Sequence, residues 1–205
     1  MLTLYHSPHT RSSRIIGLIE AMNIRDQVDI RIVDVKRQDG SGKQDPANPH
    51  PEGKVPFLVH DGVEIRESSA IILYLTDMFP ESRMGFPVGH RLRGAYLSWL
   101  SWYGGVVEPV FVHSYLQLDH PALLATFRGM AEVTERLKDA LTGQDWLMDG
   151  RYTAVDLLVS SPFQWMASLT PDEPAISDWV ARCSDQPFQS AVQAFEADAL
   201  ARIRC

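Results

Sequence analysis

The segment Lys54–Ile71, KVPFLVHDGVEIRESSAI, limits the possible folds of this chain more than any other segment. Within it, Asp61-Gly62 separates the short apolar runs Phe57–His60 and Val63–Ile65, and an Asp-Gly pair between two such runs is the strongest short-range signal for a β-hairpin. Ser68–Met78 follows and is apolar over most of a helix's surface, so we expect a mostly buried helix there. The order β-β-α predicts part of an α/β domain.

The residues before this segment supply the other elements of an α/β pattern. Leu2–His6 is a strand candidate, and Ser12–Met22 has the apolar spacing of a helix with one apolar face. Val28–Val33 alternates apolar and polar residues, as a half-buried strand does. Arg37–Pro51 is rich in Gly, Asp, Asn and Pro and is predicted to be a loop. The predicted order is therefore β-α-β, a loop and then β-β-α.

Strand patterns disappear after Phe79–Gly89, which is interrupted by prolines and glycines and is predicted to be a linker. The remaining segments have helical spacing. They are Arg91–Leu118, continuous or broken near Gly104-Gly105 or Pro109; a repeat from Leu123 to Leu141 with Asp119 as its N-cap; Thr153–Met166, opened by a capping box of Thr153 and Asp156; Pro174–Arg182; and Pro187–Ala201. We predict an α/β domain over 1–80, a linker over 81–89 and an all-helical domain over 90–205.

Charge and cysteine content exclude several classes of protein. The net charge is −7, from 26 acidic and 19 basic residues, and no basic run is present, which argues against a nucleic-acid partner. No window approaches the ~18 uninterrupted apolar residues of a membrane span, and the N-terminus lacks the pattern of a signal peptide. Cys183 and Cys205 are far apart and form no C-x-x-C pair, so we expect a cytoplasmic protein without a disulfide framework.

Several motifs together resemble those of cytosolic, bacterial-type glutathione S-transferases, and the resemblance covers essentially the whole chain. The motifs are KVPFL at Lys54–Leu58, IRESSAI at Ile65–Ile71, Tyr74-Leu75, the upstream Asn48-Pro49 and the Thr153–Asp156 cap. The resemblance implies a thioredoxin-like N-terminal domain followed by an all-helical domain. It also implies glutathione as co-substrate, no metal, a small electrophilic second substrate, a homodimer and a role in detoxification.

The resemblance further implies a set of glutathione-binding residues, which are His50, Lys54, Val55, Pro56, Glu67 and Ser68. In this family the proline is cis, and the residue before it pairs its backbone antiparallel with the cysteinyl part of glutathione. Ser68, at the start of the predicted helix, is expected to bind the γ-glutamyl carboxylate, and Glu67 its α-ammonium group. Both are also expected to cap the helix. Lys54 is expected near the glycyl carboxylate and His50 at the border of the site.

The resemblance places the sulfur-activating residue in the loop Ser7–Arg14. Since this loop contains no cysteine, mixed-disulfide chemistry is disfavoured. Thr10 is the first candidate because it precedes the apolar periodicity by about one turn, where a hydroxyl can donate to a thiolate near a helix N-terminus. Ser12 is the second candidate, although it is expected to be helical with its side chain turned away. Ser7 is the third.

The second-substrate pocket is expected in the helical domain, where aromatic residues crowd one segment. An apolar electrophile needs large aromatic walls, and we name Trp102, Tyr103 and His113 as candidates. No paired carboxylates, Ser-His-acid arrangement or metal-ligand cluster can be recognised, and the scattered histidines form no set.

The leading hypothesis is a glutathione transferase that lowers the thiol pKa of glutathione and directs the thiolate onto an electrophile. Two alternatives remain open. One is a glutathione-dependent isomerase or disulfide oxidoreductase on the same fold. The other is a non-catalytic interaction protein, because the loop contains no obvious activating Tyr or Cys.

Overall fold

The computed structural model describes residues 1–204, so Cys205 lies outside the described part. The chain forms two compact units. The first contains residues 1–82 together with the chain from 187 onward, and the second contains residues 83–186. The C-terminal segment, which the sequence pattern assigned to the helical domain, thus lies with the α/β unit. Among the described residues, no helix combines the length and apolarity needed to cross a membrane.

The first unit is built on a four-stranded mixed sheet in the order β2-β1-β3-β4. Its strands are β1 (Leu2–His6), β2 (Val28–Ile32), β3 (Phe57–His60) and β4 (Val63–Ile65). β1 is parallel to β2 and antiparallel to β3, and β3 is antiparallel to β4. Strands were predicted at these places, and the hairpin β3–β4 has the predicted bounds, since its Asp-Gly turn is a local signal.

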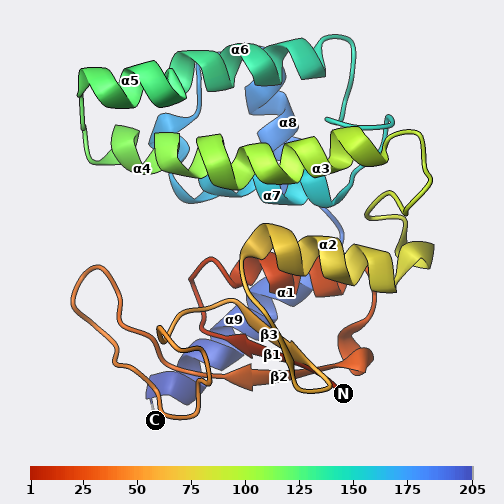
Figure 1. Cartoon of the computed structure of the whole chain (residues 1–205), viewed down its shortest axis with the longest axis vertical. Helices are drawn as coiled ribbons and strands as arrows, with labels where there is room; N and C mark the ends of the chain where they lie inside the picture. The colour runs from red at the N-terminus through yellow and green to blue at the C-terminus, as the bar shows by residue number, and fades with distance from the viewer. Residues whose placement is uncertain (205) are drawn as a thin grey trace. The chain divides into compact units, whose positions relative to one another are not determined.

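The helices of this unit are α1 (Ser13–Ala21), α2 (Ser68–Met78) and α9 (Gln189–Arg204), with short 3₁₀ turns at Arg25–Gln27 and Pro80–Ser82. α1 packs against both α2 and α9, and Figure 1 shows α1 and α2 next to each other. The core between the helices and the sheet is apolar and contains Leu4, Ile15, Ile16, Leu18, Ile19, Phe57, Leu58, Ile71, Ile72 and Leu75. The predicted thioredoxin-like fold of this half is confirmed.

The strand register brings three chain segments to one end of the sheet. Tyr5 on β1 lies opposite Phe57 on β3, so the end of β1 lies beside the start of β3. Leu58 lies opposite Ile65, so the end of β4 lies at the same end. β2 is parallel to β1 and therefore also finishes there. The loops that follow β1 and β2, the residues before β3 and the start of α2 all meet at this end.

The second unit is entirely helical within the described residues. Its helices are α3 (Arg93–Trp102), α4 (Glu108–Tyr115), α5 (Pro121–Phe127), α6 (Met130–Leu141), α7 (Ala154–Trp165) and α8 (Pro174–Ser184), with a 3₁₀ turn at Ala167–Leu169. Figure 1 shows α5 and α6 in a layer alongside α4 and α3, and α4 packs against α6. The core contains Tyr96, Val107, Val110, Phe111, Val133, Leu137, Leu158, Phe163 and Trp179. The predicted all-helical architecture is confirmed.

Two details of the helical prediction are wrong. The repeat from Leu123 to Leu141 forms two helices, because Arg128 and Gly129 both adopt positive φ, 60° and 79°. The N-cap of α5 is His120, whose ring nitrogen accepts the N–H of Ala122 at 3.2 Å, in place of Asp119. The long stretch after Arg91 runs from α3 through a π-helical turn at Tyr103–Val107 into α4, so one predicted break point changes the helix type and does not end the helix.

Candidate functional site

The candidate site lies at the end of the sheet where the segments Ser7–Ser12, Val55-Pro56 and Glu67-Ser68 meet. All three belong to the first unit. The segments contain the candidates Thr10, Ser12, Val55, Pro56, Glu67 and Ser68, so the register brings these six sequence-predicted residues to one edge. This edge joins a loop, a helix N-terminus and an extended backbone, which together offer hydroxyl and N–H donors.

The peptide bond between Val55 and Pro56 is cis, as the family resemblance implied. Val55 is half-buried and precedes β3. Among the described residues, no hydrogen bond reaches the backbone N–H or C=O group of Val55. A residue with both groups unpaired at the end of a sheet can accept one more strand-like segment.

The turn before Val55 is held by buried polar side chains. The Asn48 amide donates to the C=O of Lys54 at 3.2 Å, and Asn48 Oδ1 accepts the N–H of His50 at 3.1 Å. His50 Nδ1 accepts the N–H of Glu52 at 3.0 Å, and its ring lies edge-on to Phe57 at 5.1 Å between centroids. His50 is therefore packed inside the turn, where it supports the approach to Val55.

Lys54 is exposed and forms an ion pair with Glu52. The hydrogen bond that Lys54 donates to this neighbour raises the pKa of the Lys54 ammonium, and the charge of Glu67 raises it further. Lys54 and Glu67 therefore lie near enough for their charges to interact. The ammonium remains a cation at the rim of the site.

Glu67 holds the N-cap position of α2 with an unusual backbone, φ 66° and ψ 129°. Its C=O accepts the N–H of Ile71 at 2.9 Å, but its carboxylate makes no hydrogen bond to the first turn. The expectation that its side chain caps α2 is therefore wrong. A positive φ costs a non-glycine residue roughly 1–2 kcal/mol, and such residues cluster at ligand sites. Ser68, half-buried, is the first residue of α2.

The loop between β1 and α1 contains a compact set of hydroxyl hydrogen bonds. Thr10 Oγ1 donates to the C=O of Ser7 at 2.7 Å, lies 2.8 Å from Ser12 Oγ and accepts the N–H of Ser12 at 3.2 Å. Thr10 is partly exposed, whereas Ser12 is fully buried. Ser12 is the N-cap residue of α1 and its side chain points into the protein, so Thr10 is the hydroxyl of this pair that a ligand reaches.

Sequence reasoning missed the contacts of His6 and Glu196. Ser12 Oγ lies 2.7 Å from His6 Nδ1, and His6 Nε2 lies 3.4 Å from Glu196 Oε1 on α9. A Ser-His-acid contact is thus present, although none was recognised in the sequence. Burial, followed by the charge of His9, lowers the pKa of His6 to about 3, so the imidazole is neutral. Because Ser12 is fully buried, this contact is no hydrolytic triad.

Arg37, in the loop after β2, is a second residue that sequence reasoning missed. Its guanidinium donates to the C=O of Pro8 at 3.1 Å and to Ser7 Oγ at 3.2 Å. These bonds join the loops that follow β2 and β1 and place a permanent positive charge beside the hydroxyl network. A spacing of about thirty residues between the partners, as here between Arg37 and Ser7, leaves no local pattern to recognise.

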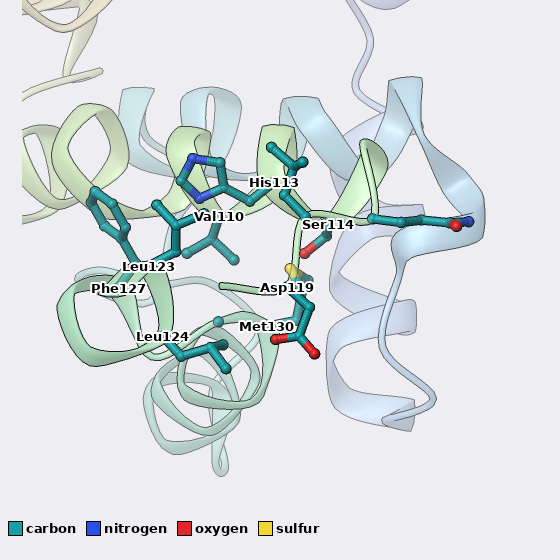
Figure 2. A pocket seen from close by; sticks show the side chains of 11 residues that line it. Val110, His113, Ser114, Asp119, Leu123, Leu124, Phe127 and Met130 are labelled. Carbon is teal, nitrogen blue, oxygen red and sulfur yellow. The ribbon is translucent and has the colours of Figure 1, made fainter. Parts of the chain in front are cut away.

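The second unit contains a cavity of about 360 Å³ beside α4, the loop that follows it, α5 and the start of α6. Val110, Leu123, Phe127 and Met130 are among its apolar lining residues. In Figure 2 the His113 ring lies next to Phe127, and the two ring centroids are 5.5 Å apart.

The candidates Trp102, Tyr103 and His113 do not share this cavity, because His113 alone of the three lines it. Tyr103 is buried. Trp102 packs edge-on against Trp99, and the Arg136 guanidinium lies 4.4 Å from its ring centroid. In the described part of the chain, no group of three or more His, Cys, Asp or Glu side chains is arranged to hold a metal ion.

Comparison with known families gives matches in both units. Residues 4–83 match the model of the glutathione S-transferase N-terminal domain, and residues 106–187 match the model of the C-terminal domain. The chain is 25% identical to a glutathione S-transferase of Escherichia coli O157:H7 over 118 residues, which are 57% of this chain and 59% of that protein. It is 26% identical to one of Xanthomonas campestris pv. campestris over 159 residues, 71% of this chain and 77% of that protein.

Solved structures show the same architecture. The structure of a sphingomonad glutathione S-transferase complexed with glutathione aligns with a TM-score of 0.75 and 24% sequence identity. The alignment covers 95% of this chain and 98% of that one. At this level of identity the match establishes the fold.

Proposed function

This chain belongs to the glutathione S-transferase family, and we propose that it binds glutathione, stabilises its thiolate and transfers it to a small apolar electrophile. The observation that carries the proposal is the meeting of Thr10, Val55-Pro56 and Glu67-Ser68 at one end of the sheet. Each segment offers a different kind of group: a hydroxyl for the sulfur, backbone N–H and C=O groups for the cysteinyl part, and a helix N-terminus with a carboxylate for the γ-glutamyl end.

Glutathione is bound mainly through its backbone and its γ-glutamyl end. The N–H and C=O groups of Val55 pair with the cysteinyl part in antiparallel fashion, at the segment that precedes β3. The N-terminus of α2 and the hydroxyl of Ser68 take the γ-glutamyl carboxylate, since a helix N-terminus favours an anion. The Glu67 carboxylate takes the α-ammonium group, and Lys54 takes the glycyl carboxylate.

The sulfur is activated at the start of α1. Thr10 turns its hydroxyl hydrogen from the C=O of Ser7 to the sulfur, and the N–H of Ser12 remains a donor to Thr10 Oγ1. The positive end of α1 and the charge of Arg37 also favour the thiolate. A free thiol has a pKa near ~8.5, and lowering it by about two units requires roughly 2.7 kcal/mol. The thiolate then forms a carbon–sulfur bond with the electrophilic carbon, while the bond from that carbon to its leaving group breaks and the leaving group departs with the bonding electron pair, as chloride does from a chlorodinitrobenzene-type substrate.

The second substrate is an apolar electrophile, and Trp102, Tyr103 and His113 remain our candidates for its pocket. Of the three, His113 has the strongest support, because it lines a cavity with apolar walls. We further propose that the protein is a homodimer, is located in the cytoplasm and contributes to detoxification.

The test is an ultraviolet difference titration of the protein with glutathione between pH 5 and 9. A thiolate absorption band that is present at neutral pH supports the proposal, as does conjugation of glutathione to a chlorodinitrobenzene-type substrate. If the protein neither conjugates glutathione nor binds immobilised glutathione, the proposal is wrong. Binding without a thiolate band favours a non-catalytic interaction protein. Activity on a maleyl-type substrate or a glutathionyl mixed disulfide, without conjugation, favours an isomerase or oxidoreductase.

A further inference from the structure

Glu196 on α9 contacts the β1–α1 loop at two points. Its Oε2 accepts the backbone N–H of His9 at 2.8 Å, and its Oε1 lies 3.4 Å from His6 Nε2. The adjacent Phe195 ring packs against the His6 ring with 5.7 Å between centroids. A single turn of the C-terminal helix therefore contacts the residue before the loop that contains Thr10 and the middle of that loop.

The carboxylate of Glu196 lies in an unusual environment. The residue is 6% exposed and His6 is fully buried, and neither Glu196 Oε1 nor His6 Nε2 has a hydrogen-bond partner in the described structure. Burying a carboxylate is costly unless it is paired and hydrogen-bonded. Buried polar atoms that stay unsatisfied are rare in native proteins and call for an explanation, such as a role in function.

The bond from Glu196 constrains the residue next to Thr10. His9 has φ 54°, in the left-handed region that non-glycine residues avoid. The carboxylate accepts the N–H of this strained residue, and Thr10 follows it directly. Without this acceptor, the strained conformation of His9 loses a compensating hydrogen bond, and the position of the Thr10 hydroxyl is less firmly fixed.

The second contact orders the hydroxyl network. The neutral His6 ring carries one N–H, and placing it on Nε2 directs it at the Glu196 carboxylate. Nδ1 then accepts the Ser12 hydroxyl hydrogen at 2.7 Å. The only hydroxyl hydrogen of Ser12 is then used in the bond to His6, so of these two hydroxyls the one that can donate to a ligand is that of Thr10.

We propose that Glu196 is a positioning residue, which fixes the β1–α1 loop through His6 and His9 and thereby directs the Thr10 hydroxyl at the glutathione sulfur. The inference rests on the proposed function and extends it, because it gives the C-terminal helix a part in activating the thiol of glutathione.

The experiment compares Glu196→Ala, Glu196→Gln and the control Asp198→Asn, which changes an exposed carboxylate on the same helix that is paired with Arg202. The first measurement, without glutathione, is amide hydrogen exchange of His9 and Thr10 by NMR. The second is the pKa of the bound thiol from the thiolate band, together with kcat and the KM for glutathione. A role confined to stability would change neither exchange at His9 in the folded protein nor the thiol pKa.

For Glu196→Ala we expect exchange at His9 to be at least tenfold faster and the bound thiol pKa to rise by about one unit. We also expect kcat to fall about tenfold and the KM for glutathione to change less than about twofold, because Val55, Glu67 and Ser68 are untouched. Glu196→Gln keeps an oxygen for the His9 N–H, so it should retain slow exchange and show a smaller rise in thiol pKa. Asp198→Asn should match the unmodified protein.

The outcomes separate the two proposals. If the unmodified protein activates glutathione and the thiol pKa is the same in Glu196→Ala, the inference is overturned and the proposed function stands. If the unmodified protein gives no thiolate band, the proposed function fails and the positioning of a thiol-activating hydroxyl fails with it, while exchange at His9 still reports whether Glu196 holds the loop. If Glu196→Ala does not fold, Glu196→Asp takes its place, because it keeps the charge on a shorter side chain. Exchange at His9 must then be faster and the thiol pKa higher in Glu196→Asp, or the inference is wrong.

Discussion

At the scale of single residues, the two hydroxyls of the β1–α1 loop have different surroundings. Ser12 is buried and bonded to His6, whereas Thr10 is partly exposed and bonded to the C=O of Ser7. The expectation that Ser12 turns away from the ligand agrees with its buried side chain, although Ser12 is the N-cap residue and not a helical one. The local sequence ranks the two hydroxyls correctly for access, but it gives no sign of the histidine that holds Ser12.

We expect Thr10→Ala to raise the pKa of bound glutathione and to lower kcat with little effect on glutathione affinity. A lost hydrogen bond to a charged group costs about 1.5–3 kcal/mol, or roughly ten- to a hundredfold in rate. Ser68→Ala should instead weaken glutathione binding, since its contact is equal in the ground and transition states. Thiolate titration and steady-state kinetics of both variants test this. A normal thiol pKa in Thr10→Ala, with a raised one in Ser12→Ala, would contradict our assignment.

Glu67 combines a strained backbone with a proposed role in binding the α-ammonium group of glutathione, and the two contributions can be separated. Glu67→Ala and Glu67→Gly both remove the carboxylate, and we expect each to weaken glutathione binding about tenfold or more. Glycine also relieves the cost of φ 66°, so Glu67→Gly should be more stable than Glu67→Ala by about 1 kcal/mol. Thermal unfolding and calorimetric titration measure the two effects. Equal stabilities would show that the backbone of Glu67 is unstrained.

At the scale of elements, local sequence signals predicted the structure well, whereas contacts between residues that are distant in the sequence could not be predicted. The hairpin at Asp61-Gly62 and the capping box at Thr153 were predicted because each signal lies within a few residues. The break at Arg128 was missed because arginine carries no turn signal and adopts positive φ there. The contact of Glu196 with His9 joins residues 187 positions apart, so no pattern in a single sequence reveals it.

The capping box of α7 anchors more than one helix, and its removal should unfold the second unit. Asp156 is buried and accepts hydrogen bonds from the N–H and hydroxyl of Thr153, the N–H of Leu147 and the indole of Trp179. Asp156→Ala leaves these donors unpaired, and we expect a loss of about 3–5 kcal/mol in unfolding free energy. Thr153→Ala should cost about 1–2 kcal/mol. Urea unfolding of both variants measures this, and equal losses would contradict the central role of the carboxylate.

At the scale of the whole molecule, the two units fold around separate cores, while the C-terminal helix returns to the first unit. The proposed glutathione-binding residues all lie in the first unit, and the candidate second-substrate residues all lie in the second. Sequence patterns alone identified this order of α/β and helical parts, but not the return of the final helix. Apolar spacing predicts that a helix has a buried face and does not say which core buries it.

We expect the protein to be a homodimer, and the structure indicates which side chains a partner could reach. Phe57, at the start of β3, is fully buried in its own chain and is unavailable to a partner. Leu97 on α3 is 37% exposed between Gly94, Ser98 and Ser101, small residues that allow a second helix to approach closely. Leu97→Lys should therefore shift the sedimenting species toward the 23.1 kDa chain, because burying an unpaired ammonium at an interface is costly. Leu124→Lys, at a 48% exposed site on α5, is the matched control. A monomer at micromolar concentration without any substitution, or a dimer that Leu97→Lys leaves intact, would refute this assignment.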